Sequence, residues 1–198
     1  MCKLSRKIVD RTIILEWEKP KTHIGDFQDY YGLDEKGNLC SIELQLLHNV
    51  GSKILHTLPS IFDIKEDLNI SKINIRDFSF SNEDYSNIQQ YLYKNTLIFK
   101  YTDKYEKDLV YKRVADDTFL IMNKVGLLQY IVLRNIDTFS FRNRILLDNT
   151  LVALIFNLYT YLVDDIVQVM SLLKEIEEAN LEELFYGEVQ DLKEELLM

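Results

Sequence analysis

Asp34, Glu43 and Gln45 are the residues whose types and spacing come closest to a catalytic pattern in this chain of 198 residues. They belong to a predicted β-hairpin with arms at 28–33 and 39–47, and Asp34 lies in the turn between the arms. Carboxylates that a hairpin brings together can hold a Mg²⁺ ion, which activates water for attack on a phosphodiester. The hairpin is therefore a candidate site for metal-dependent hydrolysis.

Metal-dependent nucleases of the restriction type place an Asp before a Glu-x-Lys motif, in which the Lys orients the attacking water. In this chain Gln45 stands at the Lys position. Glu16 and Glu18 form a second carboxylate pair on a predicted strand, with no more specific spacing. Exposed strand and turn residues explain all of these carboxylates equally well. A nuclease with a degenerate Asp…Glu-x-Gln hairpin is therefore kept only as an alternative function.

The histidines and cysteines show no spacing that is typical of a metal site. His23, His48 and His56 are isolated in the sequence. Cys40 with His48 would be a nucleophile pair, but Cys40 falls on the apolar side of its strand, where a small buried residue is expected. Glycine-rich spacings of the phosphate-binding loops are absent from the sequence. We therefore predict that the protein is not an enzyme and has no cofactor and no metal.

Tyrosines and basic residues are interleaved between Tyr91 and Arg113, a composition that suits single-stranded nucleic acid. The same segment contains Asp103, Glu106 and Asp108, and the whole protein has a net charge of −9. A solvated face of two strands explains this pattern without a ligand. We expect no direct binding to nucleic acid.

The charge imbalance is concentrated at the C-terminal end. From Asp164 to Met198 the chain has 11 acids and 2 bases, whereas the rest holds 21 of each. Most of these acids flank the predicted apolar stripes, so their carboxylates can face solvent. We predict that the following residues bind a partner: Glu175, Glu178, Glu182, Glu183, Asp191, Glu194 and Glu195.

An acidic element of this kind can present carboxylates where the phosphates of a nucleic acid would lie, and so engage a basic protein. We expect a binding protein, of the inhibitor or immunity type found in viral or bacterial defence, whose partner is a basic nuclease or nucleic-acid-binding protein. A structural or assembly subunit, with a homodimer seam on the long C-terminal helix, is a second alternative. An acidic surface that only keeps the protein in solution explains the same charge.

The long apolar segment over 149–177 is the element around which the other elements are expected to pack. Apolar residues recur at steps of three and four over 151–176, which predicts one long helix with a broad buried face. Its unbroken apolar run ends at Asp164, which is too short for a membrane span of about 20 residues. A second helix over 181–196, capped by Asn180, follows a short connection and predicts an antiparallel helical hairpin.

Upstream of these helices, period-two alternation and turn residues predict mainly strands. Strands are expected at 7–17, as one strand or two short ones, and at 28–33, 39–47, 70–80, 96–101, 109–114 and 118–122. Helices are expected at 81–92 and 125–133. The fold class is α+β, with a largely antiparallel sheet in the N-terminal two-thirds closed by the C-terminal helical hairpin. We predict a single domain over 1–198, and its one candidate seam lies near 137–148. Only two cysteines and the lack of an apolar run after the basic N-terminus predict a cytoplasmic location.

Overall fold

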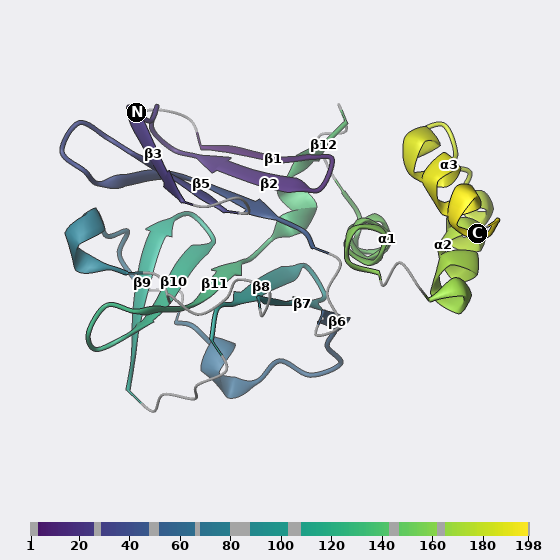
Figure 1. Ribbon diagram of the computed structural model, residues 1–198. Coiled ribbons are helices and arrows are strands. Elements are labelled where there is room, and N and C mark those ends of the chain that lie inside the picture. The colour runs from purple at the N-terminus through teal and green to yellow at the C-terminus, as the bar shows by residue number, and fades with distance from the viewer. Residues whose placement is uncertain are drawn as a thin grey trace.

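Over the part of the chain that it describes, the computed structural model is an α+β protein in which two sheets face each other and three α-helices lie at one end (Figure 1). The residues described are 4–25, 29–47, 52–65, 68–79, 88–102, 108–142, 147–161 and 165–197. Over these ranges no helix is both long enough and apolar enough to span a membrane.

The first sheet has the strand order β12-β1-β2-β5-β4-β3. Its strands are β1 (Ser5–Val9), β2 (Thr12–Glu16), β3 (Thr22–Gly25), β4 (Tyr30–Leu33), β5 (Leu39–Gln45) and β12 (Ser140–Phe141). Neighbouring strands are antiparallel except β1 and β12, which are parallel. The predicted hairpin is confirmed, because β4 pairs with β5 and Gly37 takes a φ of 77° in the turn between them.

The second sheet has the strand order β6-β7-β8-β11-β10-β9. Its strands are β6 (Lys53–Ile54), β7 (Gln89–Tyr93), β8 (Thr96–Lys100), β9 (Leu109–Ala115), β10 (Thr118–Asn123) and β11 (Leu128–Leu133). Here β6 and β7 are the parallel pair. Both sheets are mixed, so the prediction of one largely antiparallel sheet is wrong. Alternation shows which face of a strand is buried, but it does not show which distant strand lies beside it.

The facing sides of the two sheets enclose the main apolar core, which extends into the helices. Along β8, Leu97 and Phe99 belong to this core, whereas Ile98 points to the other side of the sheet. That outer side is covered by the segment 55–65, which contains the 3-10 helix η1 (Ser60–Phe62). The second sheet is therefore covered on both faces.

The helix predicted over 149–177 is interrupted, giving α1 (Asn149–Thr160) and α2 (Ile166–Glu178). Tyr161 ends α1 in an extended conformation. The Asp165 side chain then accepts a hydrogen bond from a backbone N–H of the next turn at 3.1 Å, and so caps the start of α2. The apolar stripe runs through this break, which is why its period predicts one continuous helix.

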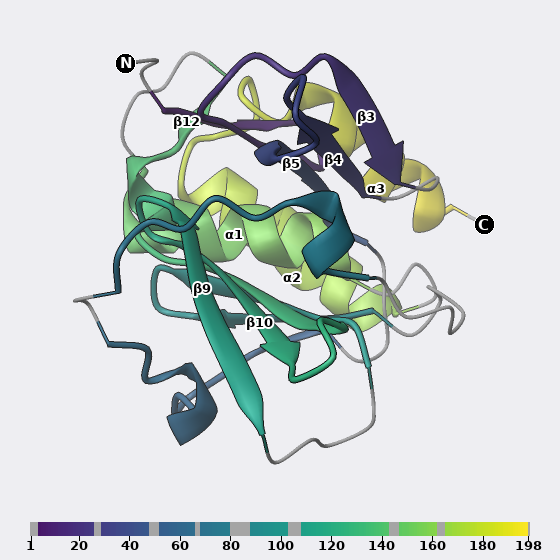
Figure 2. The same cartoon turned by 90° about the vertical axis from the view of Figure 1, so that its left-hand side faces the viewer.

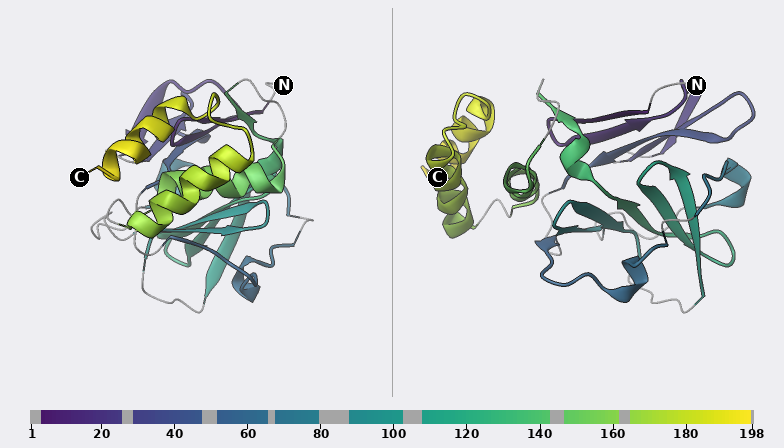
Figure 3. Two further views of the ribbon diagram at one scale, coloured as in Figure 1. Left: turned by 90° about the vertical axis from the view of Figure 1, so that its right-hand side faces the viewer. Right: turned by 180° about the vertical axis from the view of Figure 1, so that it is seen from behind.

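α1 is the central helix of the protein. Eight of its 12 residues are buried, which confirms the predicted broad buried face over this part of the segment. It runs across the open end between the two sheets (Figure 2). On its other side lie α2 and α3 (Tyr186–Glu195), which contact each other and form the outermost layer at this end of the molecule (Figure 3).

Asn180 ends α2 instead of capping α3. Its φ of 52° is left-handed, and its backbone N–H donates to the carbonyl of Glu177 at 3.0 Å. The N–H of Leu181 reaches back to the carbonyl of Ile176, also at 3.0 Å. This pair of bonds is the Schellman motif, in which Asn is tolerated at the left-handed position. The residue before α3 is Phe185, whose side chain makes no capping hydrogen bond.

Of two helix predictions upstream, one is wrong and the other is wrong within its described part, 88–92. The segment predicted as a helix over 125–133 contains strand β11, which is buried on both faces and therefore shows no period of two. In the segment predicted as a helix over 81–92, residues 81–87 lie outside the described residues, and the remainder enters strand β7. There Gln90 and Leu92 face inward, and the four-residue spacing of Ile88 and Leu92 also fits a strand.

The strand predicted over 70–80 is also wrong within its described part, 70–79. Only isolated bridges at Ile70, Asn74 and Ser79 join it to other segments, and η2 (Ile75–Asp77), a 3-10 helix, interrupts it. The Asn74 side chain accepts a hydrogen bond from a backbone N–H of η2 at 3.2 Å. This cap turns the chain where a strand would continue.

Candidate functional site

The Asp34 carboxylate holds its own turn together. It accepts hydrogen bonds from the backbone N–H groups of Lys36 and Asn38 and from the Asn38 side-chain amide, each at 2.8 Å. The bond from the Asn38 side chain, followed by the backbone bonds, lowers the pKa of Asp34. Both carboxylate oxygens therefore take part in the hydrogen bonds of the turn.

Of the candidate carboxylates, Glu18 shares a hollow with Asp34. These two line a hollow of about 100 Å³ together with Trp17 and Lys72. Glu43 lies elsewhere, beside Tyr30 on the neighbouring strand. Glu16 pairs across the sheet with Ser41 and is exposed. Among the residues that the structure describes, no three His, Cys, Asp or Glu side chains lie together as a metal site would require.

Cys40 is a buried thiol with 1% of its surface exposed. Its Sγ donates to the carbonyl of Gly32 at 3.3 Å. Burial, with a smaller effect of nearby carboxylates, raises the pKa of Cys40 to about 11. A thiol of this kind is not a nucleophile at neutral pH. Its suggested partner His48 lies outside the described residues, and His23 and His56 are exposed.

Several tyrosines of the interleaved segment are covered by protein. Tyr91 and Tyr111 pack in the cluster beneath residues 55–65, and the Tyr111 hydroxyl donates to the carbonyl of Ile61 at 3.1 Å. Tyr101 is buried between the sheets and donates to Asp29 at 2.7 Å. These three rings are therefore engaged in packing and not placed for stacking on bases. Lys104, Tyr105 and Lys107 lie outside the described residues.

The acids of α2 and α3 are mostly exposed, because the buried faces of these helices are apolar. Val169, Leu172 and Ile176 are the buried residues of α2, and Val189 and Leu192 those of α3. Exposed positions are held by Glu175, Glu178, Glu182, Glu183, Asp191 and Glu194, here called the acidic surface. Glu177, which was not among the predicted residues, is exposed as well. Six of the seven predicted partner-binding residues thus lie on the outermost layer.

Glu195 is the exception among the predicted residues. It is half-buried, and it accepts a hydrogen bond from the Tyr161 hydroxyl at 2.7 Å. Burial, followed by this hydrogen bond, raises the pKa of the Tyr161 hydroxyl. The Glu195 carboxylate therefore belongs to the packing of α3 on the end of α1. Glu188 lies seven residues earlier on the same side of α3, and it serves a similar purpose.

Arg142 and Glu188 form an ion pair that sequence reasoning missed. Arg142 follows β12 directly, and its Nη1 donates to Glu188 Oε2 at 3.2 Å while its Nη2 donates to Oε1. The Tyr159 hydroxyl of α1 donates to the same Oε1 at 2.7 Å. Burial alone would raise the pKa of Glu188, but the hydrogen bonds from Arg142 and Tyr159 outweigh it and hold the pKa below its usual range.

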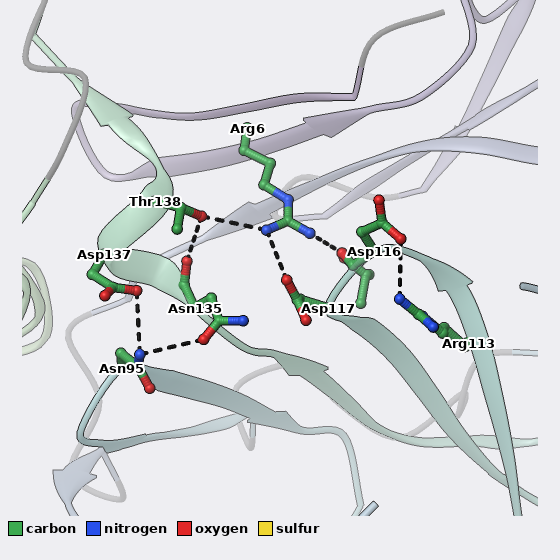
Figure 4. Close-up of polar contacts among 9 residues, drawn as sticks. Arg6, Asn95, Arg113, Asp116, Asp117, Asn135, Asp137 and Thr138 are labelled. Carbon is green, nitrogen blue, oxygen red and sulfur yellow. Dashed lines mark hydrogen bonds and ion pairs between the residues drawn. The ribbon is translucent and has the colours of Figure 1, made fainter. Parts of the chain in front are cut away.

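A second polar cluster joins the two sheets (Figure 4). Arg6 of β1 donates to Asp117 Oδ2 at 3.3 Å and to the Asp116 carbonyl, both in the turn between β9 and β10. The same guanidinium lies 3.4 Å from the Thr138 hydroxyl and 5.6 Å from the centre of the Phe139 ring. All of these contacts are internal to the fold, so we assign the cluster a structural role.

A hollow of about 460 Å³ opens between α1 and the C-terminal end of α2. Leu151, Leu154 and Leu181 form its apolar part, and Glu175 and Glu178 of the acidic surface line it as well. Apolar walls beside carboxylates suit the aliphatic stem and charged head of a Lys or Arg side chain. We call it the α1–α2 hollow.

Comparison of the chain with protein-family models and with curated proteins finds no match. We infer a function from two features of the structure, the acidic surface and the α1–α2 hollow beside it.

Proposed function

We propose that the protein is a non-enzymatic binding protein whose α2–α3 layer engages a basic protein. The observation that carries this proposal is the exposure of the acidic surface on one outermost layer. Residues 165–197 contain ten acids and only two bases, Lys174 and Lys193. Lys174 lies 3.6 Å from Glu178, so one of these two bases is paired with an acid of the same layer. Charge of one sign on one face attracts a partner of the opposite sign and speeds its association.

The partner class that suits this surface is a nuclease or another nucleic-acid-binding protein. Such proteins carry Lys and Arg in grooves that receive phosphates, and carboxylates presented from two helices can occupy the same groove. The α1–α2 hollow adds a place where one Lys or Arg side chain can dock. The proposed role is therefore that of an inhibitor or immunity-type protein, acting in the cytoplasm, that covers the nucleic-acid-binding surface of its partner.

The test compares the full chain with a charge-reversed variant carrying Glu182→Lys, Glu183→Lys and Glu194→Lys. Affinity capture from the native host, with both proteins as bait, identifies basic proteins that only the parent retains. Association with such a protein should be at least about tenfold slower for the variant, and this difference should shrink as salt screens the charges.

A matched control variant carries Glu35→Lys, Asp63→Lys and Asp77→Lys. These three acids are also exposed but lie on other elements, so the net charge changes equally and the acidic surface stays intact. The control should associate at nearly the parental rate. If the charge-reversed variant stays folded and associates as fast as the parent at low salt, the acidic surface is only a solvated face and the proposal fails.

A further inference from the structure

Three large apolar side chains are exposed within the first turns of α2. Ile166, Val167 and Met170 expose 60, 79 and 60% of their surface, and we call them the apolar triplet. Ile166 and Met170 are four residues apart and share one face of the helix, with Val167 next to it. The buried face of α2 is made by other residues, beginning with Val169. The apolar triplet is therefore not part of the core.

Nothing in the folding of α2 requires apolar residues at these positions. The helix is started by the Asp165 cap, and β-branched residues such as Ile and Val are weaker helix formers than the polar residues Glu, Gln or Lys. Single exposed apolar residues are common on protein surfaces. Adjacent ones beside a concentration of charge are typical of a surface that another molecule covers, and the same layer also exposes Tyr186 and Leu197 at 68 and 87%.

A second copy of the chain is a poor occupant for this surface. A symmetric dimer through the apolar triplet would place two α2–α3 layers against each other, each with ten acids and two bases over residues 165–197. Like charges placed across an interface oppose association. Glu177, on the same helical face as Met170, lies about 10 Å further along the axis, so the repulsion would act at the edge of the contact.

We propose that the apolar triplet is the anchoring centre of the binding surface and that the partner presents a basic amphipathic segment to it. Apolar side chains of that segment cover Ile166, Val167 and Met170, while its Lys and Arg side chains face the acidic surface. An apolar centre with a charged rim is the usual arrangement of a specific interface. This inference rests on the proposed function. The acids of the acidic surface then set the rate of association with the partner, and the apolar triplet sets the rate of dissociation.

The test uses two fluorescent peptides of equal length and equal positive charge, each of about 18 residues so that a helix can form on binding. One carries Leu along one helical face and Lys on the other, and the second has Ser in place of every Leu. Anisotropy titrations and stopped-flow measurements with the full chain should show that the Leu-Lys peptide binds at least tenfold more tightly.

A Val167→Ser, Met170→Ser variant should lose this tenfold preference through faster dissociation, with the association rate within about twofold of the parent. The control variant carries Ile70→Ser and Val125→Ser, two residues that expose 56 and 84% of their surface on other parts of the molecule. This control should bind both peptides as the parent does. Circular dichroism melts establish that each variant is folded.

Three results would overturn the inference. If the two peptides bind equally and the apolar-triplet variant matches the parent, while the charge-reversed variant associates slowly, the inference fails and the proposed function stands. If neither peptide binds, the inference fails, and the proposed function is then judged by the association rate of the charge-reversed variant. If the parent forms dimers in sedimentation experiments and the apolar-triplet variant is monomeric, a second copy covers the apolar triplet and the basic amphipathic partner is wrong.

Discussion

The Arg142 guanidinium donates two hydrogen bonds to the Glu188 carboxylate. This ion pair connects α3 to the end of the first sheet. Tyr159 of α1 donates to the same carboxylate at 2.7 Å. Three elements that are distant in the sequence therefore meet at one acidic side chain. The position of the acidic surface depends on this contact, because the surface is carried in part by α3.

Glu188→Gln should weaken the attachment of α3. Hydrogen bonds to a charged group are worth about 1.5–3 kcal/mol, and the substitution removes the charge while keeping the shape. The expected loss of unfolding free energy is of that order, measured by urea denaturation followed by circular dichroism. Glu182→Gln, which changes an exposed acid of the same layer, should leave the denaturation midpoint unchanged.

The same ion pair predicts a pH dependence. The pKa of Glu188 is lowered in the folded protein, so its contribution to stability is fully present above the pKa of an unfolded Glu, about 4.3. The contribution is lost as the pH falls from there through the lower folded value. In this acid range the parent should lose more stability than the Glu188→Gln variant. Equal losses would show that Glu188 is not ionised and paired as the structure has it.

Local patterns were sufficient to predict the hairpin of β4 and β5. The alternation through β5, with Ile42 and Leu44 buried and Glu43 half-buried, appears in the sequence and in the structure alike. It follows from the pleat of a strand and needs no knowledge of the rest of the chain. Strand β11 was not predicted, because it packs on both faces and so lacks a period of two. The break between α1 and α2 was not predicted either, because the apolar stripe of the sequence continues through it.

The sequence predicted the residues of the candidate site only where their exposure follows from neighbouring positions in the chain. Four of the six residues of the acidic surface follow from their positions between apolar residues on α2 and α3. Glu182 and Glu183 instead lie in the connection between these helices, where the sequence predicts the start of the second helix. Glu188 and Glu195 look equally free in the sequence, yet Arg142, Tyr159 and Tyr161 bind them from other elements. Pairing over such sequence separations depends on the tertiary fold, and no spacing rule within α3 indicates it.

The centre of α1 should be the most sensitive part of the core. Leu158 is buried on α1, whereas Leu162, one turn further along the predicted stripe, lies outside the described residues. Leu158→Ala should cost about 2–5 kcal/mol of unfolding free energy, because it leaves a cavity between the sheets and the outer helices. Urea denaturation measures the cost, with Leu197→Ala as an exposed control. Equal midpoints for the Leu158→Ala variant and the parent would show that α1 is not central.

Cys40 should resist alkylation in the folded protein. Its thiol is buried and its pKa is raised to about 11, so at pH 8 the thiolate that reacts with iodoacetamide is scarce. A Cys2→Ser variant, in which Cys40 is the remaining thiol, should be modified slowly in buffer and rapidly in urea, as mass spectrometry can follow. Rapid modification of the folded variant would contradict the assigned burial, and Cys40 would again be a candidate nucleophile.

The hairpin carboxylates should have no catalytic role. Asp34 uses both carboxylate oxygens within its turn, and Glu43 does not line the hollow that Asp34 and Glu18 share. Incubation of the full chain with single- and double-stranded DNA and RNA, in the presence of Mg²⁺ or Mn²⁺, should therefore give no cleavage. Asp34→Ala should instead lower the denaturation midpoint, because three hydrogen bonds of the turn are lost. Cleavage that disappears in Glu18→Gln or Glu43→Gln, in a variant that melts like the parent, would establish a nuclease and displace the proposed binding function.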